Sequence, residues 1–143
     1  MERKCVSEGK TPGVIHCIHA DYLYMGSSDV EGTTLILVVK DDHTESVFVN
    51  VVPSKGANEF TVNQIVEDID NTGHTSILFK TDNEPSMVAV QNSVKQKRSH
   101  KTVLENSVRK VSQTNGFIEN ANKYVAGVIR TLRSFANTML VLL

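Results

Sequence analysis

The chain has 143 residues, 40% of them hydrophobic, and a formal net charge of −1, so it can form one ordinary domain with a substantial core. Its polar, charged start is not that of a signal peptide, and its unbroken apolar runs are too short to span a bilayer. Two cysteines do not make a disulfide framework, so we expect an intracellular protein in a reducing compartment, with no membrane span.

The charges are unevenly distributed along the chain. Residues 1–90 hold 6 lysines and arginines against 14 aspartates and glutamates, whereas residues 91–143 hold 9 against 2. This polarity suits a protein that holds cations on one side and a polyanion on the other. The alternative is an ordinary solvated basic helix and loop, because exposed charge is the usual state of a protein surface.

The first part of the chain has the pattern of a short leader followed by strands. Residues 1–13 are polar and rich in turn-forming residues, which favours a leader or the remnant of an upstream domain. Runs rich in β-branched, aliphatic and aromatic residues then predict strands at 14–25, 33–39 and 46–52. Short turns separate these runs, which indicates an antiparallel meander.

The second part alternates between helical and strand patterns. We expect a helix at 58–69, a strand at 76–81, a helix at 86–94, a basic loop at 95–101, a short strand at 102–106 and a long helix within 112–137. A few loop residues up to Gly116 would precede the last helix. Residues 138–143 would form an apolar tail, which suggests a truncation. The sequence therefore predicts one α/β domain over 14–137, with helices packed on a mixed sheet.

The last helix carries two stripes of residues at spacings of three and four. The apolar stripe, which we expect to face the core, consists of Ile118, Ala121, Val125, Val128, Ile129, Leu132 and Phe135. The second stripe consists of Glu119, Lys123, Ala126, Arg130 and Arg133. It places one carboxylate on the same face of the helix as three cations.

Three carboxylates stand out by their positions. Asp21 lies in the first predicted strand among apolar residues, Asp82 lies at the end of the fourth strand, and Glu119 lies near the start of the last helix. An aspartate is unfavourable in a strand and costly if it is buried without a partner, so a shared metal site would explain it. Each has an ordinary alternative: Asp82 can open a turn, and Glu119 can be a first-turn helix acid.

Such a cluster suits phosphoryl transfer on DNA. Two Mg²⁺ or Mn²⁺ ions about 4 Å apart can activate an attacking oxygen and stabilise a leaving oxygen. Both ions take oxygen ligands, which three carboxylates provide. The sequence shows no Ser-His-Asp or Cys-His arrangement, and its five histidines show no metal-ligand spacing. Cys5 with the distant His16 and His19 cannot make a four-ligand zinc site.

Three segments of the chain resemble the catalytic core of retroviral and retrotransposon integrases. Residues 112–123 (SQTNGFIENANK) resemble the small-Gln-x-x-Gly-x-x-Glu-x-x-Asn segment of that family, residues 80–84 (KTDNE) its strand-end Asp segment, and residues 19–22 (HADY) its first-strand Asp segment. Between Asp82 and Glu119 lie 36 residues, close to the spacing typical of the family's Asp, Asp, Glu triad. The resemblance covers residues 14–135, and with residues 52–55 (VPSK) it is similar to copia-like polyproteins.

The resemblance implies a ribonuclease-H-like fold and an integrase-type polynucleotidyl transferase and endonuclease. Such an enzyme processes DNA 3′ ends and joins them to target DNA, works as a homo-oligomer and acts in the nucleus. Asp21, Asp82 and Glu119 would be the catalytic residues and the ligands of Mg²⁺ or Mn²⁺, with two ions. The implied DNA-binding residues are Gln113 and Asn115 in a mobile loop, Gly116 as the hinge before the catalytic helix, Lys123 and, more weakly, Arg130. The alternative for both cations is a solvated helix face.

The sequence also departs from the family pattern. Glu84 stands where many relatives have glycine, Ala126 offers no second lysine, and the upstream zinc-binding domain of integrases is not represented. An alternative function is therefore a non-catalytic nucleic-acid-binding relic of a transposable element on the same fold. A ribonuclease H acting on RNA–DNA hybrids is a third, less favoured because such enzymes commonly use a fourth carboxylate. The cluster Lys95-x-Lys97-Arg98 is a weak candidate nuclear signal.

Overall fold

The computed structural model describes residues 14–26, 34–107 and 112–142. Its strands are β1 (His16–Met25), β2 (Thr34–Asp41), β3 (Val47–Val51), β4 (Ile77–Asp82) and β5 (Thr102–Ser107). Its helices are α1 (Glu59–Thr72), α2 (Pro85–Lys97) and α3 (Ser112–Leu142). Every element that the sequence predicts therefore forms, in the predicted order, including the short strand β5.

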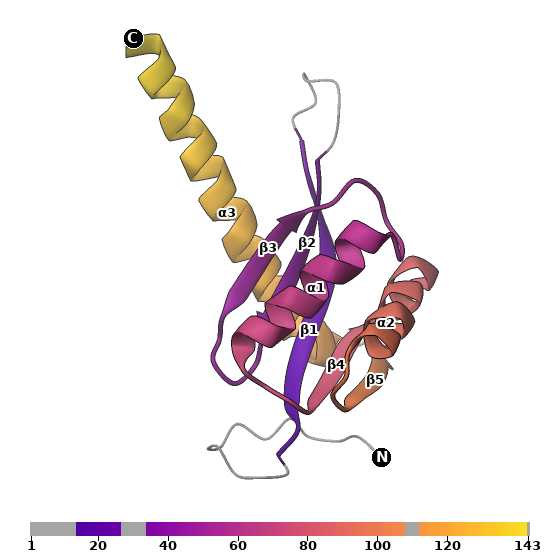
Figure 1. Ribbon diagram of the computed structural model, residues 1–143. Helices are drawn as coiled ribbons and strands as arrows, with labels where there is room; N and C mark the ends of the chain where they lie inside the picture. Colours follow the sequence, from indigo (N-terminus) through magenta and orange to yellow (C-terminus); the bar gives the residue numbers. More distant parts are fainter. Residues whose placement is uncertain (1–13, 27–33, 108–111, 143) are drawn as a thin grey trace.

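The strands form one mixed sheet in the order β3-β2-β1-β4-β5. The pairs β1–β2 and β2–β3 are antiparallel, as the short turns predict, whereas β1–β4 and β4–β5 are parallel. Helices α1 and α2 cover one face of the sheet, and α3 crosses the other (Figure 1). The predicted mixed sheet with flanking helices is confirmed.

Alternate residues of β1 build the two cores of the domain, because successive side chains of a strand point to opposite faces. Ile18, Ala20 and Tyr22 pack with α1 and α2 in the larger core. Met25 packs with the first half of α3 in the smaller core, together with Ile36 and Val38 of β2. This alternation also assigns Asp21, between Ala20 and Tyr22, to the face covered by α3.

The ends of α1 and α2 follow local signals in the sequence. Asn58 caps α1 by accepting a hydrogen bond from the Thr61 backbone N–H at 2.9 Å, and Gly73 ends it at φ 77°, a conformation that glycine adopts without strain. Pro85 opens α2, where its missing N–H costs nothing. The helix runs through Lys97, so the basic loop expected at 95–101 is shorter than predicted.

One residue of the basic cluster at the end of α2 lies in the interior of the domain, whereas Lys95 and Lys97 are exposed. Arg98 is buried, with 7% of its surface exposed. Its guanidinium donates hydrogen bonds to Thr102 Oγ1 at 3.0 Å and to the Thr75 carbonyl at 2.9 Å. These contacts tie the end of α2 to β5 and to the segment before β4, which gives Arg98 a structural role.

Helix α3 is longer than the sequence predicts at both ends. It begins at Ser112, so the loop expected up to Gly116 is helical and Gly116 lies inside the helix, not before it. Glycine costs about 1 kcal/mol in a helix, which a long helix packed on a sheet can offset. Residues 138–142, expected as an apolar tail, continue the same helix.

Only the first half of α3 packs on the sheet, and the second half projects beyond it (Figure 1). Ile118, Ala121, Val125 and Ala126 are buried, so Ala126 belongs to the core and not to the polar stripe predicted for it. Leu132 and Phe135, predicted to face the core, are more than 60% exposed. The apolar stripe therefore contacts the domain over its first part only.

The segment Gly116–Leu142 is long and apolar enough to cross a membrane by length and composition alone. The unbroken apolar runs of the sequence did not predict such a segment, because each of them is too short to span a bilayer. It is weak evidence, because the first turns of the helix pack on the sheet and the segment also carries Glu119, Lys123, Arg130 and Arg133. No membrane location is assigned to the chain from it.

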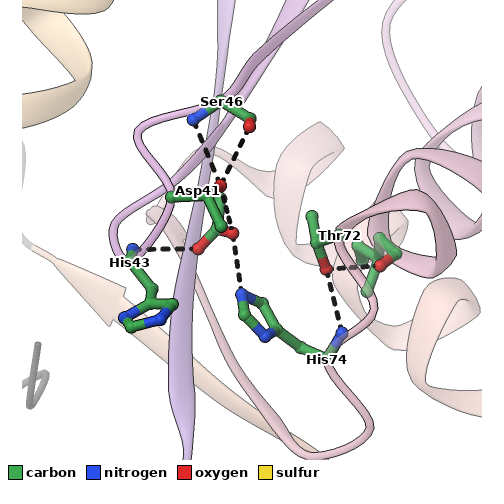
Figure 2. Close-up of polar contacts among 7 residues, drawn as sticks. Asp41, His43, Ser46, Thr72 and His74 are labelled. Atoms are coloured by element: carbon green, nitrogen blue, oxygen red, sulfur yellow. Dashed lines mark hydrogen bonds and ion pairs between the residues drawn. The ribbon is translucent and has the colours of Figure 1, made fainter. Parts of the chain in front are cut away.

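A polar network fixes the turn that follows β2 (Figure 2). The buried Asp41 carboxylate accepts hydrogen bonds from the His43 backbone N–H at 3.0 Å and from Thr44 Oγ1 at 2.7 Å. It also contacts Nε2 of His74, which follows α1, at 2.7 Å. Burial raises the pKa of Asp41, but these hydrogen bonds outweigh it and hold the pKa below its ordinary value.

Candidate functional site

The register of two parallel strands brings Asp21 and Asp82 to the same edge of the sheet. The last registered pair of β1 and β4 joins His19 to Lys80, and each aspartate lies two residues further along its strand. Strand ends at equal register on neighbouring parallel strands meet at one edge. The two carboxylates are close enough that the charge of Asp82 contributes to raising the pKa of Asp21.

Helix α3 adds the third carboxylate to this edge. Asp21, Asp82 and Glu119 all line one pocket of about 270 Å³. They come from β1, β4 and α3, which the fold brings together although 60 residues lie between Asp21 and Asp82 and 36 between Asp82 and Glu119. Glu119 is exposed, whereas Asp21 and Asp82 are half-buried, so the pocket is open to solvent on the side of the helix.

The environment of Asp21 concentrates negative charge. Its Oδ1 accepts a hydrogen bond from the Tyr22 backbone N–H at 2.9 Å, and its Oδ2 accepts one from Asn122 Nδ2 at 3.0 Å. Burial nevertheless raises the pKa of Asp21, and the neighbouring charges of Asp82 and Glu84 raise it further. A cation placed in the pocket would relieve this repulsion.

A salt bridge forms one rim of the pocket. Lys55, from the segment between β3 and α1, binds Glu84 Oε1 with its Nζ at 2.5 Å. Ser86 Oγ also donates to Glu84, at 2.9 Å, so the carboxylate that departs from the family pattern is held at the N-terminus of α2. The hydrogen bond to Glu84 raises the pKa of Lys55, which keeps this lysine charged beside the pocket.

The positions predicted to bind DNA lie along α3. Lys123 and Arg130 are exposed on the helix, outside the pocket that holds the carboxylates. Gly116 is helical and has open space around its Cα, since a Cβ built there meets no atom within 4 Å. The side chains of Gln113 and Asn115 lie outside the described part of the structure, although their backbone is helical.

Sequence reasoning missed several residues of the site. Lys55 and Lys80 line the pocket, and Lys80 also forms an ion pair with Glu105 at 3.2 Å. The role of Asn122 could have been suspected, since it occupies the final Asn of the quoted integrase segment. The histidines and Cys17 gave no sequence signal, yet the Cys17, His19 and Asp42 ligand atoms lie within 4.8 Å of one another.

The fold of the chain was compared with those of known proteins. No family model matches the chain, and no curated protein matches it by sequence. Among solved structures, it is similar to the catalytic core domain of BIV integrase, with a TM-score of 0.63, 18% identity, and coverage of 83% of this chain and 72% of that one.

Two further solved structures are similar to the chain. One is the simian T-cell lymphotropic virus intasome in complex with PP2A regulatory subunit B56 gamma, with a TM-score of 0.65, 14% identity, and coverage of 95% of this chain and 47% of that one. The other is the HTLV-2 integrase catalytic core domain in complex with magnesium, with a TM-score of 0.51, 20% identity, and coverage of 77% and 70%. At these identities the likeness concerns the fold, and the chain has the ribonuclease-H-like fold of retroviral integrase catalytic cores.

Proposed function

We propose that this domain is a metal-dependent polynucleotidyl transferase that processes DNA 3′ ends and joins them to target DNA. One observation carries the proposal: Asp21, Asp82 and Glu119, predicted from sequence segments far apart, line a single pocket. The integrase-like fold supports the same reaction class. The origin from a copia-like retrotransposon rests on the resemblance of residues 112–123, 80–84 and 52–55.

The donor set of the pocket fits hard divalent cations. All three acids offer carboxylate oxygens, which Mg²⁺ and Mn²⁺ prefer, and none offers sulfur or nitrogen. Burial raises the pKa of Asp21, the charges of Asp82 and Glu84 raise it further, and a cation in the pocket would neutralise these charges. Asp21, Asp82 and Glu119 would hold two Mg²⁺ or Mn²⁺ ions, which would supply activation of the attacking oxygen and charge stabilisation at the phosphate.

The chain's own residues would orient the acids and the DNA. Asn122 fixes the Asp21 carboxylate by its hydrogen bond, and the Glu84 backbone N–H donates to Asp82 Oδ1 at 3.1 Å. These bonds hold the two strand-end acids before a ligand arrives, which lowers the cost of organising the site. Lys55 and Lys80 add positive charge at the pocket, where a phosphate backbone would approach.

Helix α3 would contribute the DNA-binding surface. Lys123 lies one helical turn after Glu119 and is exposed, so a phosphate beside the pocket is within its reach. Arg130 lies two further turns along, with Gln113, Asn115 and Gly116 at the other end of the helix. Contacts of cations to phosphates give affinity and position but do not select a sequence. DNA ends, target DNA and further copies of the chain are the proposed partners.

The test is metal-dependent joining and disintegration of labelled DNA by the wild type and by Asp82→Asn. We expect activity with Mn²⁺ and Mg²⁺ in the wild type and its loss in Asp82→Asn. Glu67→Gln is the matched control, because Glu67 is an exposed carboxylate on α1 outside the pocket and its loss would leave activity unchanged. Circular dichroism establishes that all three proteins fold.

The same experiment separates the alternatives. A folded wild type that binds DNA but neither joins nor cleaves it would support the non-catalytic relic and overturn the proposal. Cleavage of an RNA–DNA hybrid without cleavage of plain DNA would instead indicate a ribonuclease H.

A further inference from the structure

Cys17 and His19 form a compact pair of metal-ligand side chains beside the carboxylate pocket. They lie two residues apart on β1, so their side chains share the face of the sheet that α3 covers. Both are buried, with 2% and 7% of their surfaces exposed. Cys17 Sγ lies 3.4 Å from His19 Nε2, which places a sulfur and a nitrogen donor next to each other.

Asp42 completes the group from the turn after β2. Its backbone N–H donates to the Cys17 carbonyl at 3.0 Å, which holds the turn against the start of β1. The ligand atoms of Cys17, His19 and Asp42 all lie within 4.8 Å of one another. Strand β1 and the turn after β2 thus bring a sulfur, a nitrogen and an oxygen donor together, although Asp42 is distant from Cys17 and His19 in the sequence.

The spacing of the donors suits one tetrahedral ion. Zinc–sulfur and zinc–nitrogen bonds of about 2.3 and 2.1 Å at a tetrahedral angle separate the two donors by about 3.6 Å. The observed separation between Cys17 Sγ and His19 Nε2 is 3.4 Å. A thiolate and an imidazole select Zn²⁺ and similar ions over Mg²⁺, whereas the all-oxygen pocket has the opposite preference.

We propose that Cys17, His19 and Asp42 bind one thiophilic divalent cation, Zn²⁺ or a chemical equivalent such as Co²⁺. The fourth position of the tetrahedron would be taken by water, as in zinc sites with three protein ligands. His19 also lines the carboxylate pocket, which gives the ion a path from solvent. The ion would join β1 to the β2–β3 turn, and it does not depend on the proposed strand-transfer activity.

The surroundings show what the ion would stabilise. The His19 ring lies 4.9 Å from the Phe117 ring of α3, and Lys40 lies over the same ring at 3.8 Å. His19 is therefore one of the contacts between β1 and the first turns of α3, two residues before Asp21. A metal bond to His19 would hold that ring in place and raise the stability of the contact between the sheet and α3.

The experiment uses the full chain with Cys5→Ser, which leaves Cys17 as the single thiol, since the sequence has 2 cysteines. Titration with Co²⁺ should produce a thiolate-to-cobalt charge-transfer band that saturates at one ion per chain. Zn²⁺ should remove the band, whereas a large excess of Mg²⁺ should leave it. Absence of the band from folded protein would overturn the proposal.

Variants of the other two ligands test whether the thiol acts with partners. His19→Ala and Asp42→Asn should each weaken Co²⁺ binding by about tenfold or more, since the loss of even an outer-sphere partner of a metal costs that much. The exposed His100→Ala and the pocket variant Asp82→Asn are matched controls that should leave the band unchanged. Unchanged binding in both His19→Ala and Asp42→Asn would show an isolated thiol and contradict the site.

A thermal measurement keeps the test decisive if one variant is unstable. Zn²⁺ at saturating concentration should raise the Tm of the Cys5→Ser chain, because an ion that binds only the folded state stabilises it. It should not raise the Tm of Cys5→Ser combined with Cys17→Ser. An equal rise in both proteins would place the ion elsewhere and would overturn the proposal.

Discussion

Asn122 Nδ2 donates a hydrogen bond to Asp21 Oδ2 at 3.0 Å, across 101 positions of the sequence. The bond joins α3 to β1 at the pocket and connects the final Asn of the integrase-like pattern to the first acid of the proposed triad. Among the residues that the structure describes, no group donates a hydrogen bond to the buried Asn122 Oδ1. The hydrogen bonding of this side chain is therefore directed to the Asp21 carboxylate, which it orients.

Removal of this amide should weaken metal binding while the fold persists. In Asn122→Ala, Asp21 loses a donor that lowers its pKa, and its orientation is no longer fixed. Loss of an outer-sphere partner of this kind typically weakens metal affinity by about 10- to 100-fold. Isothermal titration with Mn²⁺ measures the effect. Asn120→Ala, at an exposed position of the same helix, is the control. Equal affinities in the two variants would show that Asn122 does not support the site.

The Asp21 carboxylate should reduce stability at neutral pH when no cation is bound. Because its folded-state pKa is raised above the ordinary 3.8, ionisation opposes folding, and this cost is present above the folded pKa and disappears as the pH falls toward 3.8. We therefore expect Asp21→Asn to have a higher Tm than the wild type at pH 7.5 without divalent metal. Mg²⁺ should raise the Tm of the wild type more than that of the variant. A lower Tm for Asp21→Asn would contradict this account.

His16, at the start of β1, should make the fold sensitive to acid together with the neighbouring His43 and His74. His16 stacks on His74 with 3.9 Å between ring centroids and lies 4.7 Å from the His43 ring. Burial, and then the neighbouring His74 and His43, lower the pKa of His16 below its ordinary 6.5, and Asp41 opposes this only in part. The fold thus prefers the neutral ring, and this stability is complete above pH 6.5 and is lost as the pH falls through the folded pKa.

A non-titrating ring at this position tests the assignment. His16→Phe keeps a planar ring for stacking but cannot be protonated. The fall in Tm between pH 7.5 and pH 5.5 should be smaller in His16→Phe than in the wild type. An identical fall in both would place the acid sensitivity at another group.

The helical position of Gly116 makes its proposed role as a hinge testable. Alanine fits at Gly116 and at Gly127 without a clash, because a Cβ at either site meets no atom within 4 Å. Each substitution should stabilise the helix by up to about 1 kcal/mol. We expect Gly116→Ala, near the pocket, to reduce strand transfer, whereas Gly127→Ala should not. Full activity in Gly116→Ala would remove the hinge from the account.

Lys123 should contribute to DNA affinity without sequence preference. In Lys123→Ala, binding should weaken to a similar extent for unrelated sequences, and the slope of log affinity against log salt should become shallower by about 1. Arg133→Ala, at an exposed position three helical turns from Lys123, is the control. A salt slope that stays the same in Lys123→Ala would show that this lysine lies outside the DNA contact.

The sequence carried enough local information to predict the order of strands and helices. Asn58, Gly73 and Pro85 are local signals of helix ends, and each acts as the sequence suggests. The start of α3 could not be predicted in this way, because Gly116 has a low helix propensity and packing of Ile118 and Ala121 on the sheet overrides it. The burial of Ala126 has the same cause, because packing of α3 against the sheet decides which of its side chains are buried.

Contacts between distant segments could not be predicted without the sheet register. The pairing of Lys55 with Glu84, and the approach of Asp42 to Cys17 and His19, depend on which strands are neighbours. The grouping of Asp21, Asp82 and Glu119 was predicted only because three motifs resemble those of one family, and the pocket agrees with that grouping.

The most direct test of the central proposal is strand transfer by single variants of all three acids. If Asp21, Asp82 and Glu119 act as one metal site, then Asp21→Asn, Asp82→Asn and Glu119→Gln should each abolish Mg²⁺-dependent joining of labelled DNA, while each variant stays folded and binds DNA. If Glu119→Gln, or either aspartate variant, joins DNA as efficiently as the wild type, the three carboxylates do not form one catalytic site and the account is wrong.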